Sequence, residues 1–204
     1  LVPGRGYVLE GMLVDQETKK AAVDAQGNKI TAKTTFTPAK KDGSVEIVFK
    51  FDGSGLKGKT LTAYEELFYN GKSVAEHKDA EDKEQTIYFP EIATAATDEE
   101  TELQMSYADE EVTIRDVVRY ENLISGKKYT MQGTLRDKVS GQPLKDAEGK
   151  EIMSRTEFTA KDTDGEVDVV FRFDGSLLAG RITVAFEELL VEKKSIAVHA
   201  DLND

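Results

Sequence analysis

The sequence predicts an all-β chain built from two tandem β-sandwich domains. Short apolar segments alternate with turn residues along the chain, and no long stretch has the 3.6-residue period of a helix. The chain also repeats itself, because residues 1–82 align with residues 123–204 without a gap at a constant offset. His77 and His199, for example, are 122 positions apart. A period of this length corresponds to a whole domain rather than to one turn of a solenoid.

The first repeat contains a series of short segments rich in β-forming residues. The segment 45–51 alternates well and places Val45, Ile47, Phe49 and Phe51 on one face. Asn70-Gly71 is a strong hairpin signal between one strand and the next arm, which begins at Ser73. We expect a loop with room for one helical turn at 52–58, and a charged loop at 80–84. The expected strands are 7–14, 30–37, 45–51, 60–68, the hairpin arm from Ser73, and 85–89.

The second repeat begins after Pro90, which ends the last strand of the first. We expect strands at 92–97 and 112–120, with an acidic segment between them, and the pattern of the first repeat from Leu123 onward. The predicted domains are therefore 1–90 and 91–204, with a short linker near Pro90-Glu91. Many short strands with regular turns favour two immunoglobulin-like sandwiches in line.

Composition excludes several classes of function. The 204 residues carry a formal net charge of −12, which argues against nucleic acids and anionic membranes as partners. No run of 18 apolar residues is present, so we expect no membrane span. The absence of cysteine excludes disulfides and thiolate chemistry, and it fits either a reducing cytosol or an exported protein. The absence of tryptophan argues against a carbohydrate-binding face.

Acidic residues lie in apolar rows of two predicted strands. Asp116 shares a face with Val112, Ile114 and Val118. In the strand 184–190, Glu187 shares a face with Ala185 and Leu189, and Glu188 shares the other face with Val184 and Phe186, so one of these two acids must point to the apolar side. A carboxyl group in such a row keeps its proton or finds a partner, and two of them close together would share one proton. Both histidines of the chain fall at the same repeat position, which favours a functional role over a structural one. Acids and a histidine together form an acid–base set.

At this level of detail the chain resembles a known family. The residues that carry the resemblance are Phe186-Glu187-Glu188-Leu189, His77-x-Asp79-x-x-Asp82-x-x-Gln85, Pro90-Glu91-Ile92-Ala93-Thr94 and the segment from Asp116 to Leu123. They resemble the VaFE-type repeats, the Thr–Gln ester-bond domains of Gram-positive surface adhesins. The resemblance covers essentially the whole chain and depends on the combination of motifs rather than on any one of them.

The resemblance implies a CnaB-like fold and a reaction of the protein with itself. In these domains a threonine on the first strand attacks the side-chain amide of a glutamine on the last strand, and an ester remains after ammonia has left. Carried over by position, Thr94 is the nucleophile of the second repeat, in preference to Thr97, and His199 orients or deprotonates it. Asp116 and Glu187 would be the proton-sharing acids. In the first repeat, Glu65, His77 and Gln85 match the acid, the histidine and the acyl donor.

The resemblance also implies a structural protein with single-turnover chemistry at most, a cell-wall-anchored extracellular location, and no cofactor or metal. By the repeat offset, the glutamine of the second repeat falls at position 207, and the threonine and aspartate of the first repeat fall before residue 1. We therefore expect domain 1–90 without its N-terminal strands and domain 91–204 without its glutamine strand. The expected partners are neighbouring repeats of the same adhesin, with strand complementation by another copy.

Other interpretations remain open from the sequence. One is an immunoglobulin-like spacer without a cross-link, or with a Lys–Asn isopeptide bond, although no lysine lies in an apolar row as Asp116 does. Another is a ligand-binding adhesin domain. The acidic segment 98–102 is typical of a solvated loop, with calcium binding as the alternative.

Overall fold

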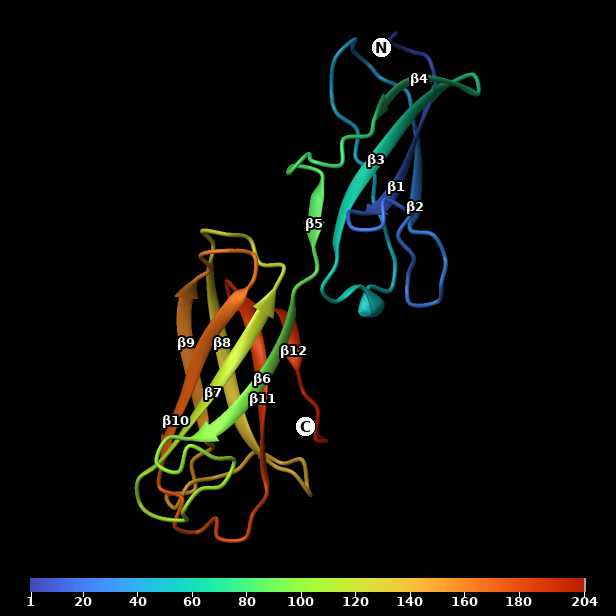
Figure 1. Cartoon of the computed structure of the whole chain (residues 1–204). Coiled ribbons are helices and arrows are strands. Elements are labelled where there is room, and N and C mark those ends of the chain that lie inside the picture. The colour runs from blue at the N-terminus through green and yellow to red at the C-terminus, as the bar shows by residue number, and fades with distance from the viewer. Residues whose placement is uncertain (204) are drawn as a thin grey trace. The chain divides into compact units, whose positions relative to one another are not determined.

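The computed structural model describes residues 1–203 and divides the chain into two compact units, Leu1–Phe89 and Pro90–Asp204 (Figure 1). Both units are built from antiparallel strands, and one short 3₁₀ helix, η1 (Ser54–Leu56), lies in the expected loop of the first unit. The all-β prediction is confirmed. The division falls between Phe89 and Pro90.

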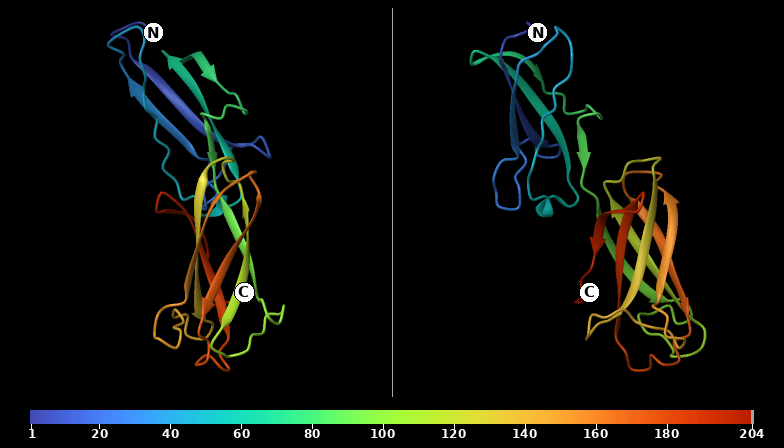
Figure 2. Two further views of the ribbon diagram at one scale, coloured as in Figure 1. Left: turned by 90° about the vertical axis from the view of Figure 1, so that its left-hand side faces the viewer. Right: turned by 180° about the vertical axis from the view of Figure 1, so that it is seen from behind.

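The second unit is a sandwich of two antiparallel sheets (Figures 1 and 2). Its hydrophobic core lies between the sheets and includes Val118, Met131, Phe171 and Leu189, which are almost completely buried. The edge strand β6 also lies against β11 and β12 of the facing sheet. One sheet has the order β10-β7-β6, with β6 (Glu91–Asp98), β7 (Val112–Glu121) and β10 (Gly165–Phe173). The other has the order β12-β11-β8-β9, with β8 (Lys128–Asp137), β9 (Met153–Thr159), β11 (Thr183–Val191) and β12 (Lys194–His199).

The alternation of side chains explains why these segments form a sandwich. In β8 every second residue from Tyr129 to Asp137 is buried, whereas the residues between them are half-buried. In β7 the buried positions are Val112, Asp116, Val118 and Tyr120, on the face predicted from the sequence. Each strand therefore presents one apolar face to the core, as expected of two packed sheets.

The first unit contains one sheet, with the order β2-β1-β3-β4 and with β5 also paired to β3. Its core consists of Leu13, Ala22, Ile30, Leu56, Leu61 and Ala63, with Phe49, Phe51 and Phe89 packed against them. The strands are β1 (Tyr7–Asp15), β2 (Thr31–Phe36), β3 (Thr60–Tyr69), β4 (Lys72–His77) and β5 (Thr86–Tyr88). By the repeat offset this sheet corresponds to the β8–β9–β11–β12 sheet of the second unit.

The prediction of a strand at 45–51 is wrong, because this segment forms no ladder in the structure. The repeat explains the difference. The equivalent strand β10 pairs only with β7, and no strand of the unit Leu1–Phe89 corresponds to β7. An alternating segment becomes a strand only when a neighbour accepts its backbone hydrogen bonds. The local pattern was therefore informative about the side chains but not about the pairing.

The two hairpins that carry the histidines are equivalent. Asn70 and Gly71 turn β3 into β4 with φ values of 47° and 75°, and Glu192 and Lys193 turn β11 into β12 with 49° and 70°. Positive φ at both central residues is the signature of the tight hairpin turns that match strand twist. The hairpin predicted at Asn70-Gly71 is confirmed.

Among residues 1–203, no helix has the length and apolar character that crossing a membrane requires.

Candidate functional site

The hydroxyl group of Thr94 contacts a buried carboxylate of the neighbouring strand. Thr94 of β6 pairs with Val118 of β7, and Asp116 of β7 pairs with Ala96, so Thr94 and Asp116 are diagonal neighbours on one face. Thr94 Oγ1 donates a hydrogen bond to Asp116 Oδ1. The other oxygen, Asp116 Oδ2, is buried and has no hydrogen-bond partner among the described residues. The structure thus places the threonine and the aspartate predicted from the sequence in direct contact.

Thr97 lies on the other face of β6 from Thr94. It pairs with Arg115, whose guanidinium group forms an ion pair with Asp168, and it alternates out of the face that holds Thr94. Thr94 is therefore the threonine of β6 that contacts Asp116, and this geometry supports its choice as the nucleophile.

Glu187 and His199 face each other across two neighbouring strands of the opposite sheet. They are direct partners in the β11–β12 ladder, and Glu187 is only 1% exposed. Because β6 packs against β11 and β12, the strands that carry Thr94, Glu187 and His199 lie side by side at this edge of the sandwich (Figure 2). Four chemically suitable groups, a hydroxyl, two acids and an imidazole, therefore come from four strands of one unit.

The first unit repeats the acid–histidine pair. Glu65 and His77 are direct partners in the β3–β4 ladder. Burial raises the pKa of Glu65, its electrostatic interaction with His77 opposes this effect, and the negative charge of Asp82 adds to it. The pKa of Glu65 is therefore raised above its ordinary value, so this carboxyl keeps its proton to a higher pH than an exposed glutamate does.

Asp82 contacts His77, a contact that no periodic pattern in the sequence predicts. His77 Nε2 lies 3.1 Å from Asp82 Oδ2, and the main-chain carbonyl of Asp82 accepts hydrogen bonds from the Thr86 hydroxyl at 2.7 Å and from the Gln85 N–H at 3.2 Å. The signal that could have identified it is the fixed spacing His77-x-x-x-x-Asp82-x-x-Gln85. Its repeat equivalent, Asp204, lies outside the described residues.

Gln85 lies beside β3, close to Glu65 along that strand. Its carbonyl accepts a hydrogen bond from the Ala63 N–H at 3.0 Å, and Ala63 and Glu65 point to the same side of β3. Gln16 anchors this region, because its amide nitrogen lies 2.8 Å from Thr62 Oγ1, 3.0 Å from the Ala80 carbonyl and 3.2 Å from Thr86 Oγ1. The first unit therefore pairs Glu65 with His77 and holds the Gln85 backbone beside the same strand. The second unit places Thr94 against Asp116 and pairs Glu187 with His199.

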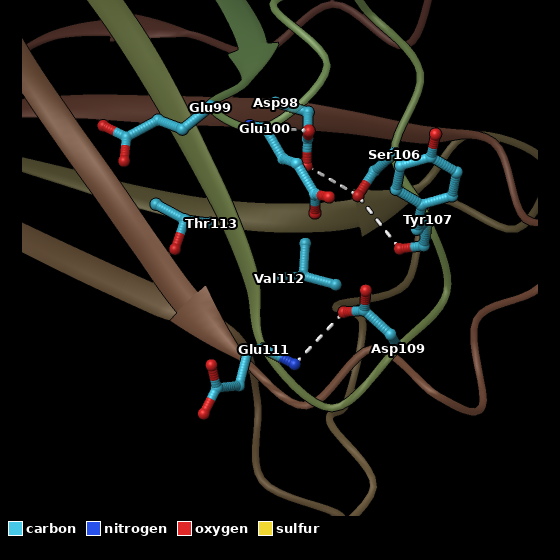
Figure 3. Close-up of a pocket in the computed structure, with 9 residues that line it drawn as sticks. All are labelled: Asp98, Glu99, Glu100, Ser106, Tyr107, Asp109, Glu111, Val112 and Thr113. Carbon is cyan, nitrogen blue, oxygen red and sulfur yellow. Dashed lines mark hydrogen bonds between the residues drawn. The ribbon is translucent and has the colours of Figure 1, made fainter.

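The acidic segment after β6 forms a hydrogen-bonded loop around a small hollow (Figure 3). The carboxylate of Asp98 accepts hydrogen bonds from the N–H groups of Glu100 and Thr101 and from the Ser106 hydroxyl. Burial raises the pKa of Asp98, but these hydrogen bonds outweigh that effect, so its pKa is lowered. Within residues 1–203, no group of three or more acidic or histidine side chains is arranged to hold a metal ion.

Comparison with solved structures gives distant similarities. A bacterial adhesin from Mobiluncus mulieris, which contains intramolecular disulfide, isopeptide and ester bond cross-links, is 18% identical with a TM-score of 0.42. The match covers 56% of this chain and 54% of the adhesin chain, so the present chain spans about half of that protein. A glycosyl hydrolase family 2 member from Bacteroides cellulosilyticus is 10% identical with a TM-score of 0.40, over 96% of this chain and 24% of the hydrolase. No curated protein is similar enough to match the chain.

A sequence model of a protein family matches both units in full. The model describes the T-Q ester bond containing domain, and its two matches cover residues 1–89 and 90–204. These matches span the whole chain with one domain per unit. The chain therefore belongs to the family of T-Q ester bond containing domains.

Proposed function

We propose that the chain is a structural stalk segment of a bacterial cell-surface adhesin, in which each domain is braced by a Thr–Gln ester that it forms by itself. The observation that carries this proposal is the hydrogen bond from Thr94 Oγ1 to the buried Asp116 carboxylate, at the edge where β6 packs against β11 and β12. Membership of the T-Q ester bond family supports the same function. The tandem arrangement of two such units supports a stalk built from neighbouring repeats.

The reaction transfers the acyl group of a glutamine side chain from nitrogen to oxygen. Thr94 Oγ attacks the side-chain carbonyl carbon of the glutamine, the new O–C bond forms, the C–N bond breaks, and ammonia leaves. The proton of the threonine hydroxyl passes to the departing nitrogen. Primary amides react very slowly with alcohols, so the fold must supply high effective concentration by holding the two strands side by side. It must also supply an acid and a base.

The described residues offer these groups. Asp116 accepts the hydrogen bond from Thr94 and holds the hydroxyl in place, while its second oxygen is buried without a hydrogen-bond partner among residues 1–203. That oxygen suits a carboxyl that donates a proton to the glutamine carbonyl as charge develops there. In this proposal Glu187, the ladder partner of His199, is the second acid of a proton-sharing pair with Asp116. His199 orients the threonine or takes its proton as the reaction proceeds.

The product remains attached to the chain, so each site acts once and the protein is structural rather than a turnover enzyme. A covalent brace of this kind replaces the disulfides that the chain cannot form, because it has no cysteine. An extracellular, cell-wall-anchored location in a Gram-positive bacterium belongs to the same proposal.

An extended chain tests the reaction in the second unit. The sequence of residues 83–90 is added after residue 204, which places a glutamine at the repeat spacing from His199. The mass of the denatured protein is expected to be lower than the calculated mass by one ammonia. Thr94→Ala should abolish this loss, whereas the matched control Thr97→Ala should retain it. An extended protein of full calculated mass would contradict the proposal.

A further inference from the structure

The loop between β6 and β7, residues 99–111, exposes three large apolar side chains. Leu103, Met105 and Tyr107 are 51%, 68% and 62% exposed, and they occupy alternate positions of the loop. Single exposed apolar residues are common on protein surfaces, whereas three within five positions concentrate apolar area on one loop. Concentrations of this kind mark interaction sites. The ester site uses none of the three residues, so the proposed function leaves them unexplained.

Hydrogen bonds fix the main chain of this loop. The Asp98 N–H donates to the Leu103 carbonyl at 2.8 Å, and the Ser106 hydroxyl turns inward to the Asp98 carboxylate at 2.7 Å. Farther along the loop, the carbonyl of Asp109 accepts a hydrogen bond from the Gly175 N–H at 2.8 Å. The loop is therefore held to the rest of the unit on both sides of its apolar residues. A partner that binds these residues meets a surface that is already formed, which lowers the entropic cost of binding.

A hollow of about 240 Å³ opens beside Tyr107, which is one of its lining residues (Figure 3). Figure 3 shows the carboxylates of Glu100 and Asp109 directed into this hollow from opposite sides. The carboxylates of Glu99 and Glu111 are directed away from it. Sites for small molecules typically measure about 300–1,000 Å³. The hollow is smaller than that, so its size suits one side chain of a partner rather than a whole small molecule.

The β6–β7 loop is acidic and contains no basic residue. Six of its thirteen residues are acids: Glu99, Glu100, Glu102, Asp109, Glu110 and Glu111. The ion pairs formed among residues 1–203 use none of these six side chains. Arg115 interacts electrostatically with Glu99, but its guanidinium group is bound to Asp168. The charge of the loop therefore complements that of a positively charged partner.

We propose that the β6–β7 loop binds a basic segment of another protein, with one lysine or arginine side chain in the hollow. The cation lies between the carboxylates of Glu100 and Asp109 and contacts the ring of Tyr107, while its alkyl stem lies on Val112. Apolar residues on either side of the cation pack against the exposed apolar side chains of the loop. Binding at this loop does not depend on ester formation.

The first test titrates the isotope-labelled full chain with a synthetic peptide in which arginine and leucine alternate. Binding is measured from the amide chemical shifts of residues 98–113. Two control peptides have the same length, one with glutamine in place of every arginine and the other with serine in place of every leucine. The alternating peptide should shift the loop amides and bind at least about tenfold more tightly than either control. Equal binding of the serine peptide would show charge attraction alone and would overturn the proposal, as would unchanged loop amides.

Two double variants of equal net charge test the hollow. Glu100→Gln with Asp109→Asn removes the charges that are directed into it, whereas Glu99→Gln with Glu111→Gln removes the same charge from side chains directed away. Asparagine at position 109 still offers an oxygen to the Glu111 N–H, which the aspartate binds at 3.1 Å. The first pair of substitutions should weaken binding about fivefold more than the second. Equal weakening would mean that only net charge matters, and the hollow would then not be the site.

The apolar contact has its own matched control. Met105→Ser should weaken binding of the alternating peptide about fivefold, because apolar area is no longer buried. Ile124→Ser removes an apolar side chain that is also exposed but that follows β7, at the other end of this strand from the loop. It should leave the affinity unchanged. Equal effects of the two substitutions would overturn the assignment of the binding surface.

Two further measurements distinguish other occupants of the loop. Calcium at about 1 mM, added to the free chain, should leave the amide shifts of residues 98–113 unchanged. Saturable shifts with calcium would identify a metal site instead and would overturn the proposal. Without peptide, the same shifts should also be independent of protein concentration. A dependence on concentration would identify a second copy of this chain as the occupant and would likewise overturn it.

Discussion

Glu65 of β3 is the direct cross-strand partner of His77 of β4, and Glu187 and His199 form the same pair in the β11–β12 ladder. Direct partners in an antiparallel ladder have their side chains on one face, separated by about 5 Å between Cβ atoms. Each unit therefore holds an acid and an imidazole together through backbone pairing alone. This pairing is present whether or not the rest of the site is assembled.

Glu65→Gln is expected to stabilise the first unit at neutral pH. Because the pKa of folded Glu65 is raised, chiefly by burial, the folded state binds its proton more tightly than the unfolded chain does. Its contribution to stability therefore falls as pH rises from the ordinary glutamate value through the folded value. Hydrogen exchange should show greater protection of β3 in the variant than in the original protein at about pH 7, and equal protection in the two below about pH 4. Lower protection of the variant at neutral pH would contradict this explanation.

The neighbouring residue provides a control of opposite sign. A hydrogen bond from Ser73, followed by the contact with Lys78, lowers the pKa of Glu66, so its ionised form favours the folded state. Glu66→Gln should reduce protection of β3 at about pH 7, and the difference should disappear as the pH falls below the folded pKa of Glu66.

Replacement of both Thr94 and Asp116 by valine should stabilise the second unit while abolishing ester formation. Asp116 is fully buried among Val112, Ile114 and Val118, and apolar side chains of similar volume there remove the cost of an incompletely bonded carboxyl group. We expect a gain of about 1–3 kcal/mol in the free energy of unfolding. Denaturant unfolding measures it, and a loss of stability would mean that the carboxylate contributes to folding.

Gly133→Ala should destabilise the second unit by about 1–3 kcal/mol, because its Cβ would overlap the Phe171 ring. Gly11→Ala creates the same overlap with Phe49, but residues 43–51 have no ladder and can move away. We therefore expect a smaller loss for Gly11→Ala. Thermal or urea unfolding of the two variants tests this order, and an equal loss would show that residues 43–51 are as rigid as β10.

Swapping the two central residues of one hairpin turn for those of the other should stabilise the β11–β12 hairpin and destabilise the β3–β4 hairpin. Glu192 and Lys193 adopt positive φ without the advantage of glycine, whereas Asn70 and Gly71 suit these angles. Glu192→Asn with Lys193→Gly should stabilise the β11–β12 hairpin by about 1 kcal/mol, since a non-glycine residue there costs about that amount. Asn70→Glu with Gly71→Lys should cost about as much in β3–β4. Hydrogen exchange of β4 and β12 tests both, and a loss of protection in β12 would contradict the assignment of strain to Lys193.

The sequence was informative where structure depends on local alternation and on the repeat. The face of β7 follows from its period-two pattern, so the burial of Asp116 could be predicted. In β11 the same pattern left Glu187 and Glu188 open, and the resemblance selected Glu187, which the structure buries. The segment 45–51 has an equally clear pattern, but it forms no strand because pairing depends on a distant partner. Asp82 belongs to the motif that carries the resemblance, but no role could be predicted for it, because its contact arises from a loop that folds back on His77 and no periodicity reports such a contact. The residue roles proposed for Thr94, Asp116, Glu187, His199, Glu65, His77 and Gln85 remain predictions.

The connection from β5 to β6 has a mechanical consequence. Gln85 and Thr94 are only nine positions apart, and Pro90 lies between them. If both residues were esterified, a force applied along the chain would enter each domain at its threonine and leave it at its glutamine. The strands between the threonine and the glutamine of one domain would then carry no load. Only the short run between Gln85 and Thr94 would stretch, to at most about 32 Å. The array would then behave as a tether of nearly fixed length, whose extension under force depends on the number of joints rather than on domain unfolding.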